Sequence, residues 1–269
     1  MTTRTVKAIL VGATAVLTGA ALLTGCGTQT KVEGVRDYPA TATPPIGQGG
    51  DGLVLRWRMT GGMAGRGGPW TVPDFSLYAD GTAIVPGKGP EARLQRYHLK
   101  QPVFQQLVAE ARKAGLERSR RIGSDARIAD AMVLRIWMGS AQTDVVMPEQ
   151  HNVPATAVWK KLQPEQWPAG DQQSPPDVYQ PERIAVSAFP SGDRPAPSGT
   201  VAWPLSPLGA GTKLPQGSFC TVYGGADAAR VRKLAAKTPL GASFSSGGQV
   251  YSVQIRPLLP DEKSCTALG

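Results

Sequence analysis

The sequence has few of the side chains from which active sites are commonly built. Its 269 residues include two histidines and three cysteines, and neither His98 nor His151 has a cysteine or a second histidine close by. Because metal sites need several such ligands at short spacing, the sequence predicts no metal site and no cofactor. The motifs Gly-x-Ser-x-Gly, Ser-x-x-Lys and Cys-x-x-Cys are also missing. Their absence removes the commonest local signatures of nucleophilic and redox catalysis, and it leaves open a triad built from distant residues.

Carboxylate pairs offer another route to hydrolysis, since a glycosidase needs two carboxyl groups across a cleft. Two such pairs stand close in the sequence, Asp177 with Glu182 and Asp261 with Glu262. Neighbouring carboxylates in turns are usually ordinary surface groups, and both pairs are interpreted in that way.

A hydrophobic run long enough to span a membrane dependably is missing too. The longest apolar stretch, residues 8–23 (AILVGATAVLTGAALL), is short and rich in small residues, and it follows Arg4 and Lys7. This pattern is typical of the core of a signal peptide. It ends in Leu-Thr-Gly-Cys, which resembles a bacterial lipoprotein signal. The resemblance implies cleavage between Gly25 and Cys26, and fatty acyl chains such as palmitate on Cys26. The alternative is an uncleaved amino-terminal helix with an incidental cysteine.

The three cysteines fit this interpretation. If lipid occupies Cys26, then Cys220 and Cys265 remain as one pair in an oxidising compartment outside the cytoplasm. We expect a disulfide between them, worth roughly 4 kcal/mol from the loop that it closes. Two separately buried free thiols are the alternative.

Positive charge is in excess, with a formal net charge of +9 at pH 7. One segment is densely basic, and its candidate anion-binding residues are Arg112, Lys113, Arg118, Arg120, Arg121 and Arg127. For an anchored, exported protein, the nearest anions are lipid head groups and cell-wall polymers rather than nucleic acid. The alternative is a solvated surface without a ligand.

Proline marks the domain organisation. Eleven of the 24 prolines lie between residues 163 and 215, and residues 163–181 show no periodic pattern. The predicted parts are a signal peptide, a flexible polar tether, an N-terminal lobe, a Pro-rich linker and a C-terminal lobe, at residues 1–25, 26–51, 52–162, 163–181 and 182–269.

Both lobes show alternating strands around turn residues and one or two helical patterns. In the first lobe, Asp80-Gly81 is the strongest hairpin signal. The predicted strands there are residues 53–59, 74–79, 82–85, 131–138 and 142–147, and the helices are residues 102–114 and 154–162. In the second lobe they are strands at residues 183–188, 219–223, 241–246 and 249–256, and a helix at residues 227–237. The sequence therefore predicts an α+β fold, with two lobes of antiparallel hairpins each packed on a helix and joined by a Pro-rich segment.

Two further features concern partners. The segment at residues 256–262 (RPLLPDE) is either a rigid recognition edge or a plug in which Leu258 and Leu259 fill the core of the second lobe. The six tryptophans are interpreted as packing residues rather than as a carbohydrate platform, with Trp167 and Trp203 the two to examine for exposure.

Three segments carry a family resemblance: residues 73–87 (PDFSLYADGTAIVPG), 111–116 (ARKAGL) and 251–265 (YSVQIRPLLPDEKSC). Together they resemble a group of secreted lipoproteins of high-GC Gram-positive (actinobacterial) bacteria. The resemblance touches both lobes and implies almost nothing about activity. One departure is Lys100-Gln101-Pro102 at a helix entry, where a Ser or Thr cap is expected.

These observations favour a non-enzymatic lipoprotein, anchored on the outer face of the cytoplasmic membrane, that binds an envelope protein, an anionic polymer or a small ligand. The alternative is an envelope hydrolase with a dispersed active site. A solute-binding component of a transporter is a third hypothesis, but such proteins show repeated strand-helix alternation, which this sequence lacks.

Overall fold

The structure is a computed structural model, and it describes residues 36–37, 52–63, 65–68, 70–89, 93–123, 130–192, 196–239 and 241–268. The described residues all lie in one compact unit, Glu33–Gly269. The predicted signal peptide, Cys26, Arg127 and the predicted tether apart from residues 36–37 lie outside the described residues.

The first lobe is built on a nine-stranded sheet with the order β1-β6-β8-β7-β2-β3-β4-β5-β9. Its pairs are antiparallel, except that β6 runs parallel to β8. The strands are β1 (Arg36–Asp37), β2 (Leu53–Gly61), β3 (Phe75–Tyr78), β4 (Thr82–Val85), β5 (Gln95–His98), β6 (Arg120–Ile122), β7 (Met132–Met138), β8 (Ala141–Val146) and β9 (Asp177–Val178).

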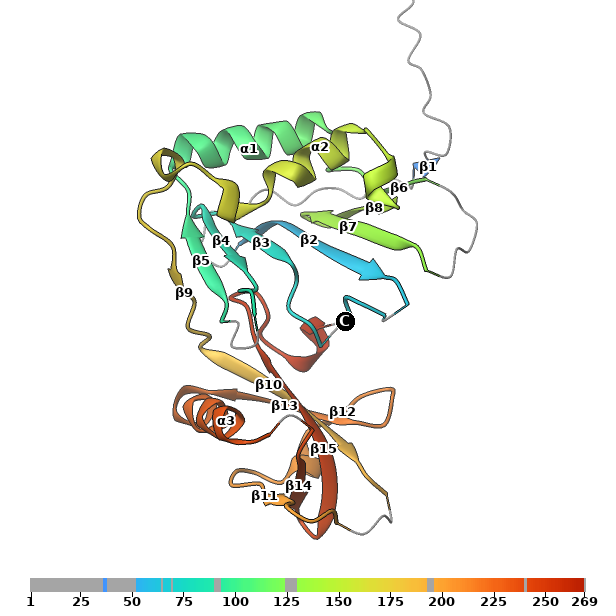
Figure 1. The fold of residues 1–269 in the computed structure, drawn as a ribbon, viewed down its shortest axis with the longest axis vertical. Coiled ribbons are helices and arrows are strands. Elements are labelled where there is room, and N and C mark those ends of the chain that lie inside the picture. The colour runs from blue at the N-terminus through green and yellow to red at the C-terminus, as the bar shows by residue number, and fades with distance from the viewer. Residues whose placement is uncertain are drawn as a thin grey trace, which may run out of the picture. The chain divides into compact units, whose positions relative to one another are not determined.

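Helices α1 (Gln101–Lys113) and α2 (Pro154–Lys161) cover one face of this sheet (Figure 1). Apolar side chains from both helices pack with alternate strand residues into one large core, in which Leu55, Leu77 and Ile136 are fully buried. No side chain caps the start of α1, but Pro102 occupies its first turn, where a missing N–H costs no hydrogen bond. Its end is set by Gly115, which adopts a φ of +74°.

The second lobe has a six-stranded sheet with the order β11-β14-β15-β10-β13-β12, in which β11 and β14 run parallel. Helix α3 (Gly225–Lys237) packs on it, and Trp203 lies against Tyr223 and Phe244 in its core. The strands are β10 (Arg183–Pro190), β11 (Val201–Ala202), β12 (Thr212–Lys213), β13 (Phe219–Gly224), β14 (Ser243–Ser246) and β15 (Gln249–Pro257). Five short 3-10 turns complete the described elements, namely η1 (Pro148–Gln150), η2 (Pro164–Gln166), η3 (Ala169–Asp171), η4 (Leu208–Ala210) and η5 (Cys265–Leu268).

The α+β prediction with two lobes is confirmed, because the described chain contains two sheets and three helices. The three helices and nine of the fifteen described strands lie in predicted segments, whereas β5, β6, β11 and β12 were not predicted. Two stretches are more ordered than their composition suggests. The Pro-rich segment holds η2, η3 and β9, and β9 pairs with β5. Within the predicted tether, Arg36–Asp37 form β1 beside β6. Short edge strands of this kind have almost no sequence pattern of their own, because the neighbouring strand supplies their hydrogen bonds.

The C-terminal segment, residues 258–268, joins the two lobes. Leu258 packs with Ala185 and Cys220 of the second lobe, as the core-plug interpretation expects. Leu259, in contrast, packs with Tyr78 and Ile84 of the first lobe. The two leucines are neighbours in the chain, yet each belongs to a different core.

Candidate anion-binding site

The first sheet has a second face, opposite α1 and α2, that is rich in arginine. Along β7, Leu134, Ile136 and Met138 point into the helix-covered core and are almost completely buried. Because side chains alternate along a strand, Arg135 and Trp137 lie on the other face. The same alternation puts Arg56 and Arg58 of β2 on that face, and Gln142 and Asp144 of β8.

The strand register sets charged side chains of this face next to one another. Each member of the set is the direct partner of the next on the adjacent strand. This arginine row runs from β2 across β7 and β8 to β6 and consists of Arg58, Arg135, Asp144 and Arg121. The row contains three guanidinium groups and one carboxylate, which leaves two positive charges in excess within the row.

Asp144 holds the side chains of Arg135 and Arg121 in place. Arg135 donates from Nε and Nη2 to the two carboxylate oxygens, at 2.9 and 3.0 Å. Arg121 Nη1 lies 3.6 Å from Asp144 Oδ2. The hydrogen bond to Asp144 raises the pKa of Arg135. Both side chains still face solvent, since Arg135 is 35% and Arg121 is 31% exposed.

Arg58 donates its hydrogen bonds to backbone carbonyl oxygens and not to a carboxylate. Its two terminal nitrogens donate to the carbonyl oxygens of Gly67, Gly68 and Thr71, at 2.8 to 2.9 Å. Burial lowers the pKa of Arg58, and the positive charges of Arg256 and Arg56 lower it further.

Trp137 lies beside the arginine row on β7. Its Nε1 donates to Gln142 Oε1 at 3.1 Å, and Gln142 Nε2 donates to Asp144 Oδ1 at 3.1 Å. The guanidinium carbon of Arg135 lies 5.9 Å from the indole centroid, within the range of a cation–π contact. Trp137 is half-buried and belongs to none of the hydrophobic clusters formed by the described residues. We call Arg121, Arg135, Trp137, Gln142 and Asp144 together the basic aromatic face.

The other tryptophans of the described chain pack as the sequence predicts. Trp57 and Trp203 are buried, and Trp70, Trp159 and Trp167 pack against hydrophobic clusters. Neither Trp167 nor Trp203 is exposed.

The basic cluster predicted from the sequence is only partly brought together here. Arg121 is its one member in the arginine row. Arg112 pairs with Glu117 at 3.0 Å, at the end of α1. Arg120 donates to the carbonyl oxygen of Ala114, and so it satisfies the end of the same helix. Lys113 and Arg118 are exposed, and Arg127 lies outside the described residues.

Sequence reasoning missed Arg135, Trp137, Gln142 and Asp144. A signal for them was present, because the predicted strands around Gly139-Ser140 form a hairpin. Pairing residue 135 with 144 and residue 137 with 142 across that turn would have put all four on one face. The contribution of Arg58 and Arg121 had no comparable signal, since it depends on the order of strands that are distant in sequence.

The half of the same sheet face that lies over β2 and β3 is closed by the C-terminal segment. Asp261 accepts hydrogen bonds from Arg56 Nη2 at 2.8 Å and from the Tyr78 hydroxyl at 2.7 Å. Arg56 Nε also donates to Ser76 Oγ at 2.9 Å. Burial raises the pKa of Tyr78 well above its usual range, and the neighbouring charge of Asp261 raises it further.

A buried ion pair stands behind these contacts. Arg256 Nη2 donates to Glu262 Oε1 at 2.6 Å, and each residue is only 2% exposed. Glu262 also accepts from the Leu259 N–H at 3.0 Å. The interpretation of Asp261 and Glu262 as ordinary surface carboxylates is therefore wrong. Two separate arginines draw them inward: Arg56, which is 205 residues from Asp261 in the chain, and Arg256, which is six residues before Glu262. Asp177 is on the surface, where it pairs with Arg96.

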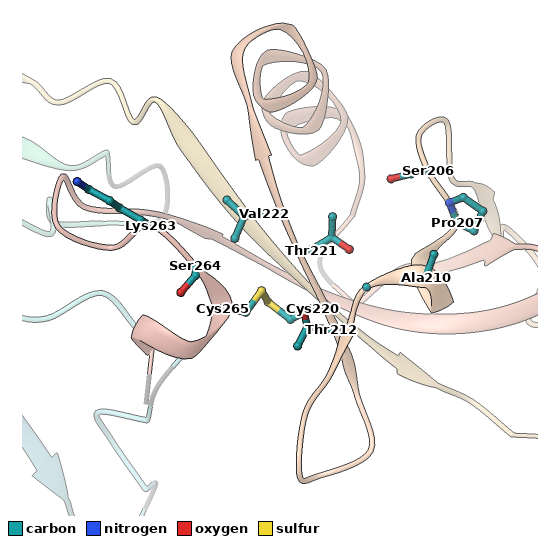
Figure 2. A pocket seen from close by; sticks show the side chains of 11 residues that line it. Ser206, Pro207, Ala210, Thr212, Cys220, Thr221, Val222, Lys263, Ser264 and Cys265 are labelled. Carbon is teal, nitrogen blue, oxygen red and sulfur yellow. A yellow bond between two sulfur atoms is a disulfide. The ribbon is translucent and has the colours of Figure 1, made fainter.

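The second lobe has an open pocket of about 400 Å³ beside the disulfide (Figure 2). Small side chains from η4, β12 and β13 line one part of it, and the C-terminal segment lines the other, with Lys263 as the one ionisable side chain of the lining. A dispersed hydrolase site needs at least two ionisable groups that converge. The lining of this pocket does not provide that pair.

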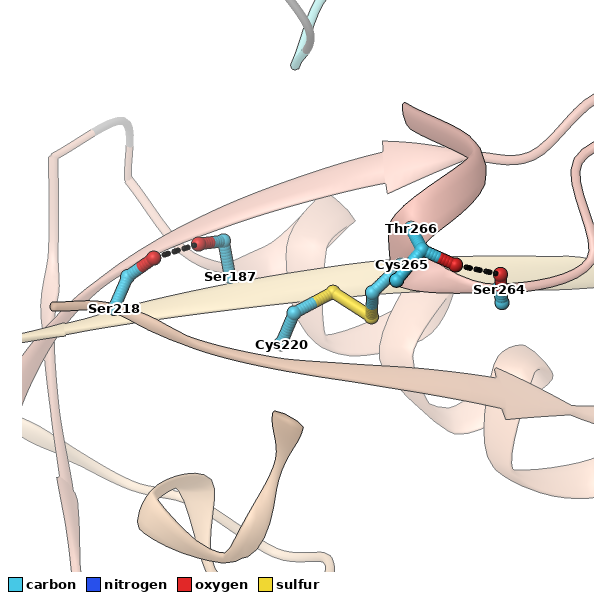
Figure 3. The surroundings of a disulfide bond; sticks show 6 residues. All are labelled: Ser187, Ser218, Cys220, Ser264, Cys265 and Thr266. Carbon is cyan, nitrogen blue, oxygen red and sulfur yellow. Dashed lines mark hydrogen bonds between the residues drawn. A yellow bond between two sulfur atoms is a disulfide. The ribbon is translucent and has the colours of Figure 1, made fainter. Parts of the chain in front are cut away.

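The predicted disulfide between Cys220 and Cys265 is confirmed. Figure 3 shows it between β13 and η5, with the hydrogen bond from Ser187 of β10 to Ser218, which lies just before β13. It fastens the C-terminal segment to the second sheet, close to the residues that contact the first lobe.

Comparisons with protein-family models, with curated proteins and with solved structures found no match to this chain. Within the described ranges, no three histidine, cysteine or acidic side chains are grouped so that they could hold a metal ion. No helix among the described residues combines the length and the apolar character needed to cross a membrane.

Proposed function

We propose that this protein is a lipid-anchored, extracytoplasmic lipoprotein that acts as a non-enzymatic binding module of the cell envelope. The observation that carries the proposal is the pairing of Cys220 with Cys265. A structural disulfide fits an oxidising compartment, and it leaves Cys26 as the odd cysteine at the end of the lipoprotein-like signal. The resemblance to secreted actinobacterial lipoproteins supports the same placement.

Binding is favoured over catalysis by the kind of surface that the first sheet offers. The basic aromatic face combines half-exposed arginines with an indole whose position is fixed by hydrogen bonds. Rigid strands hold these groups in place before any ligand arrives, which lowers the entropy cost of binding. Such a surface suits recognition of an anion in the envelope.

Lipid attachment is tested by labelling. We expect the protein expressed in an actinobacterial host to incorporate labelled palmitate and to sediment with membranes. The mass of its amino-terminal peptide should correspond to a chain that begins at acylated Cys26. The Cys26→Ser variant should incorporate no label. A matched double variant, Cys220→Ser with Cys265→Ser, should still incorporate the label. If this variant does not fold, the mass of its amino-terminal peptide still reports whether Cys26 is acylated. An unmodified thiol at Cys26 in the wild-type protein would contradict the proposal.

A further inference from the structure

We infer that the basic aromatic face binds an acidic polysaccharide of the envelope, with a sugar ring on the indole of Trp137 and its acidic group at Arg135 and Arg121. The choice of a saccharide over a nucleic acid rests on the proposed function, because export brings the face among envelope polymers. The ligand class itself follows from three properties of the face.

The first property is unbalanced positive charge that solvent can reach. Arg121 and Arg135 share one carboxylate, and both remain about one-third exposed. A guanidinium bound to one carboxylate still has free donors on its other edge. Arg135 commits Nε and Nη2 to Asp144, and its Nη1 has no hydrogen-bond partner among the residues that the structure describes. A carboxylate or phosphate of a ligand would find charge-assisted donors there.

The second property is a positioned aromatic ring beside that charge. The indole of Trp137 is tied to β8 through Gln142, and the Arg135 guanidinium lies over one face of the ring, 5.9 Å from its centroid. The face of an aromatic ring carries partial negative charge, so the ring face turned away from Arg135 can attract the C–H groups of a sugar ring. The other described tryptophans are buried or pack against hydrophobic clusters. Trp137 is half-buried and outside those clusters, and it is also the one beside an excess of cations.

The third property separates this face from a membrane-binding surface. Lysines and arginines that bind an anionic bilayer usually extend as a patch without acidic residues. Here Asp144 stands in the middle of the arginines and holds their side chains across the sheet. A single acidic group next to a sugar ring can contact the arginines on either side of Asp144. A continuous anionic surface would also lie against the Asp144 carboxylate and be repelled by it.

The inference is tested by binding measurements on the mature lipidated protein, purified in detergent. Polygalacturonate is the probe, and the comparison ligands are neutral dextran, polyglutamate, phosphatidylglycerol vesicles and single-stranded oligodeoxythymidylate. We expect the tightest binding to polygalacturonate. Arg135→Gln should weaken it about tenfold, as expected for a lost charge-assisted hydrogen bond. Trp137→Leu should weaken it about fivefold through loss of the aromatic face, and Trp137→Phe should keep most of the affinity.

Arg96→Gln is the matched control. Arg96 lies on the same sheet face, is exposed to a similar degree at 36%, and makes the same two-point contact with one carboxylate, that of Asp177. It differs in having no indole and no excess of charge beside it. We expect this variant to bind polygalacturonate as the wild-type protein does.

The inference is overturned if polygalacturonate does not bind, or if Arg135→Gln or Trp137→Leu binds it normally. It is also overturned if polyglutamate, vesicles or the oligonucleotide bind as tightly as the saccharide. Because the assay uses purified protein, its failure leaves the labelling result at Cys26 intact. A negative labelling result with normal saccharide binding would instead contradict the lipoprotein proposal alone.

Discussion

One face of the first sheet has two halves that start from the same chemistry and end differently. In the closed half, Arg56 of β2 is paired with Asp261, which is 205 residues away in the chain. In the open half, Arg121 and Arg135 rely on Asp144 alone and stay in contact with solvent. Arginine on an exposed strand face is therefore no guide to binding by itself. The supply of carboxylates from elsewhere in the chain decides which arginines become structural and which remain available.

Burial separates the two halves energetically. The closed half contains the nearly inaccessible pair of Arg256 and Glu262, whose charges have little water around them. Breaking such a pair leaves an uncompensated buried charge, whereas breaking an exposed pair lets water replace the partner. The two halves should therefore respond very differently to the same kind of substitution.

The largest expected effect comes from Glu262→Gln. It removes the carboxylate that is hydrogen-bonded to buried Arg256. The loss adds to an existing deficit, because Arg256 Nε and Nη1 already lack hydrogen-bond partners. We expect the free energy of unfolding in urea to fall by about 3–5 kcal/mol. The matched change in the open half, Arg135→Gln, should lower it by about 0–1 kcal/mol. Equal losses in the two variants would remove the distinction between the halves.

The next effect comes from the disulfide that fastens the covering segment. Cys220→Ser with Cys265→Ser should lower the free energy of unfolding by about 2–4 kcal/mol. The same variant should also change local stability, because the C-terminal segment should open more often without the disulfide. Hydrogen exchange should become faster at the Leu259 amide, which is bonded to Glu262, and stay unchanged along β7 and β8. Faster exchange on β7 and β8 as well would show that the open half also depends on the segment.

The smallest effect concerns alkaline pH and Tyr78. The folded protein holds the pKa of Tyr78 above its value of about 10 in the unfolded chain, so the folded state retains a proton that the unfolded state loses. The contribution of Tyr78 to stability is therefore constant below about pH 10 and falls as the pH rises further. Tyr78→Phe should cost about 1–3 kcal/mol at neutral pH through the lost bond to Asp261, and the fall above pH 10 should become shallower.

Tyr179→Phe is the control for that pH profile. Burial raises the pKa of Tyr179 to about 12, and its contribution is lost between about pH 10 and that value. We therefore expect Tyr179→Phe to flatten the profile less than Tyr78→Phe does, as measured by urea unfolding at a series of pH values. A steeper profile in Tyr78→Phe than in the wild-type protein would contradict the assignment.

Local pattern predicted much of this fold. The alternation at residues 131–138 and the Asp80-Gly81 turn produced the observed β7 and the β3–β4 hairpin, and the apolar period of residues 102–114 produced α1. These elements are set by neighbours within one turn or one strand, so the sequence contains their signal. The edge strands β1 and β9 were missed, because two residues of pairing are defined by the strand beside them.

The candidate site was less predictable than the fold. The sequence suggested a basic cluster, but helix ends and local ion pairs use Arg112 and Arg120, and Arg121 alone reaches the arginine row. Arg135 and Trp137 looked like ordinary members of an alternating strand. The β7–β8 hairpin register places them beside Asp144 and Gln142, but the arginine row became visible only when β2 was known to lie beside β7 and β6 beside β8.

The sequence by itself determined where the helices and most of the strands form and indicated which cysteines pair, because periodicity, turn residues and the number of thiols are properties of the chain. Only the tertiary structure decided that Asp261 and Glu262 turn inward to Arg56 and Arg256, while Arg121 and Arg135 keep a single carboxylate between them. The physical reason is that electrostatic pairing depends on distance in space. Strand order and a C-terminal segment fastened across two lobes bring Arg56 to Asp261 and Arg121 to Asp144, and no short spacing in the sequence encodes these two pairs.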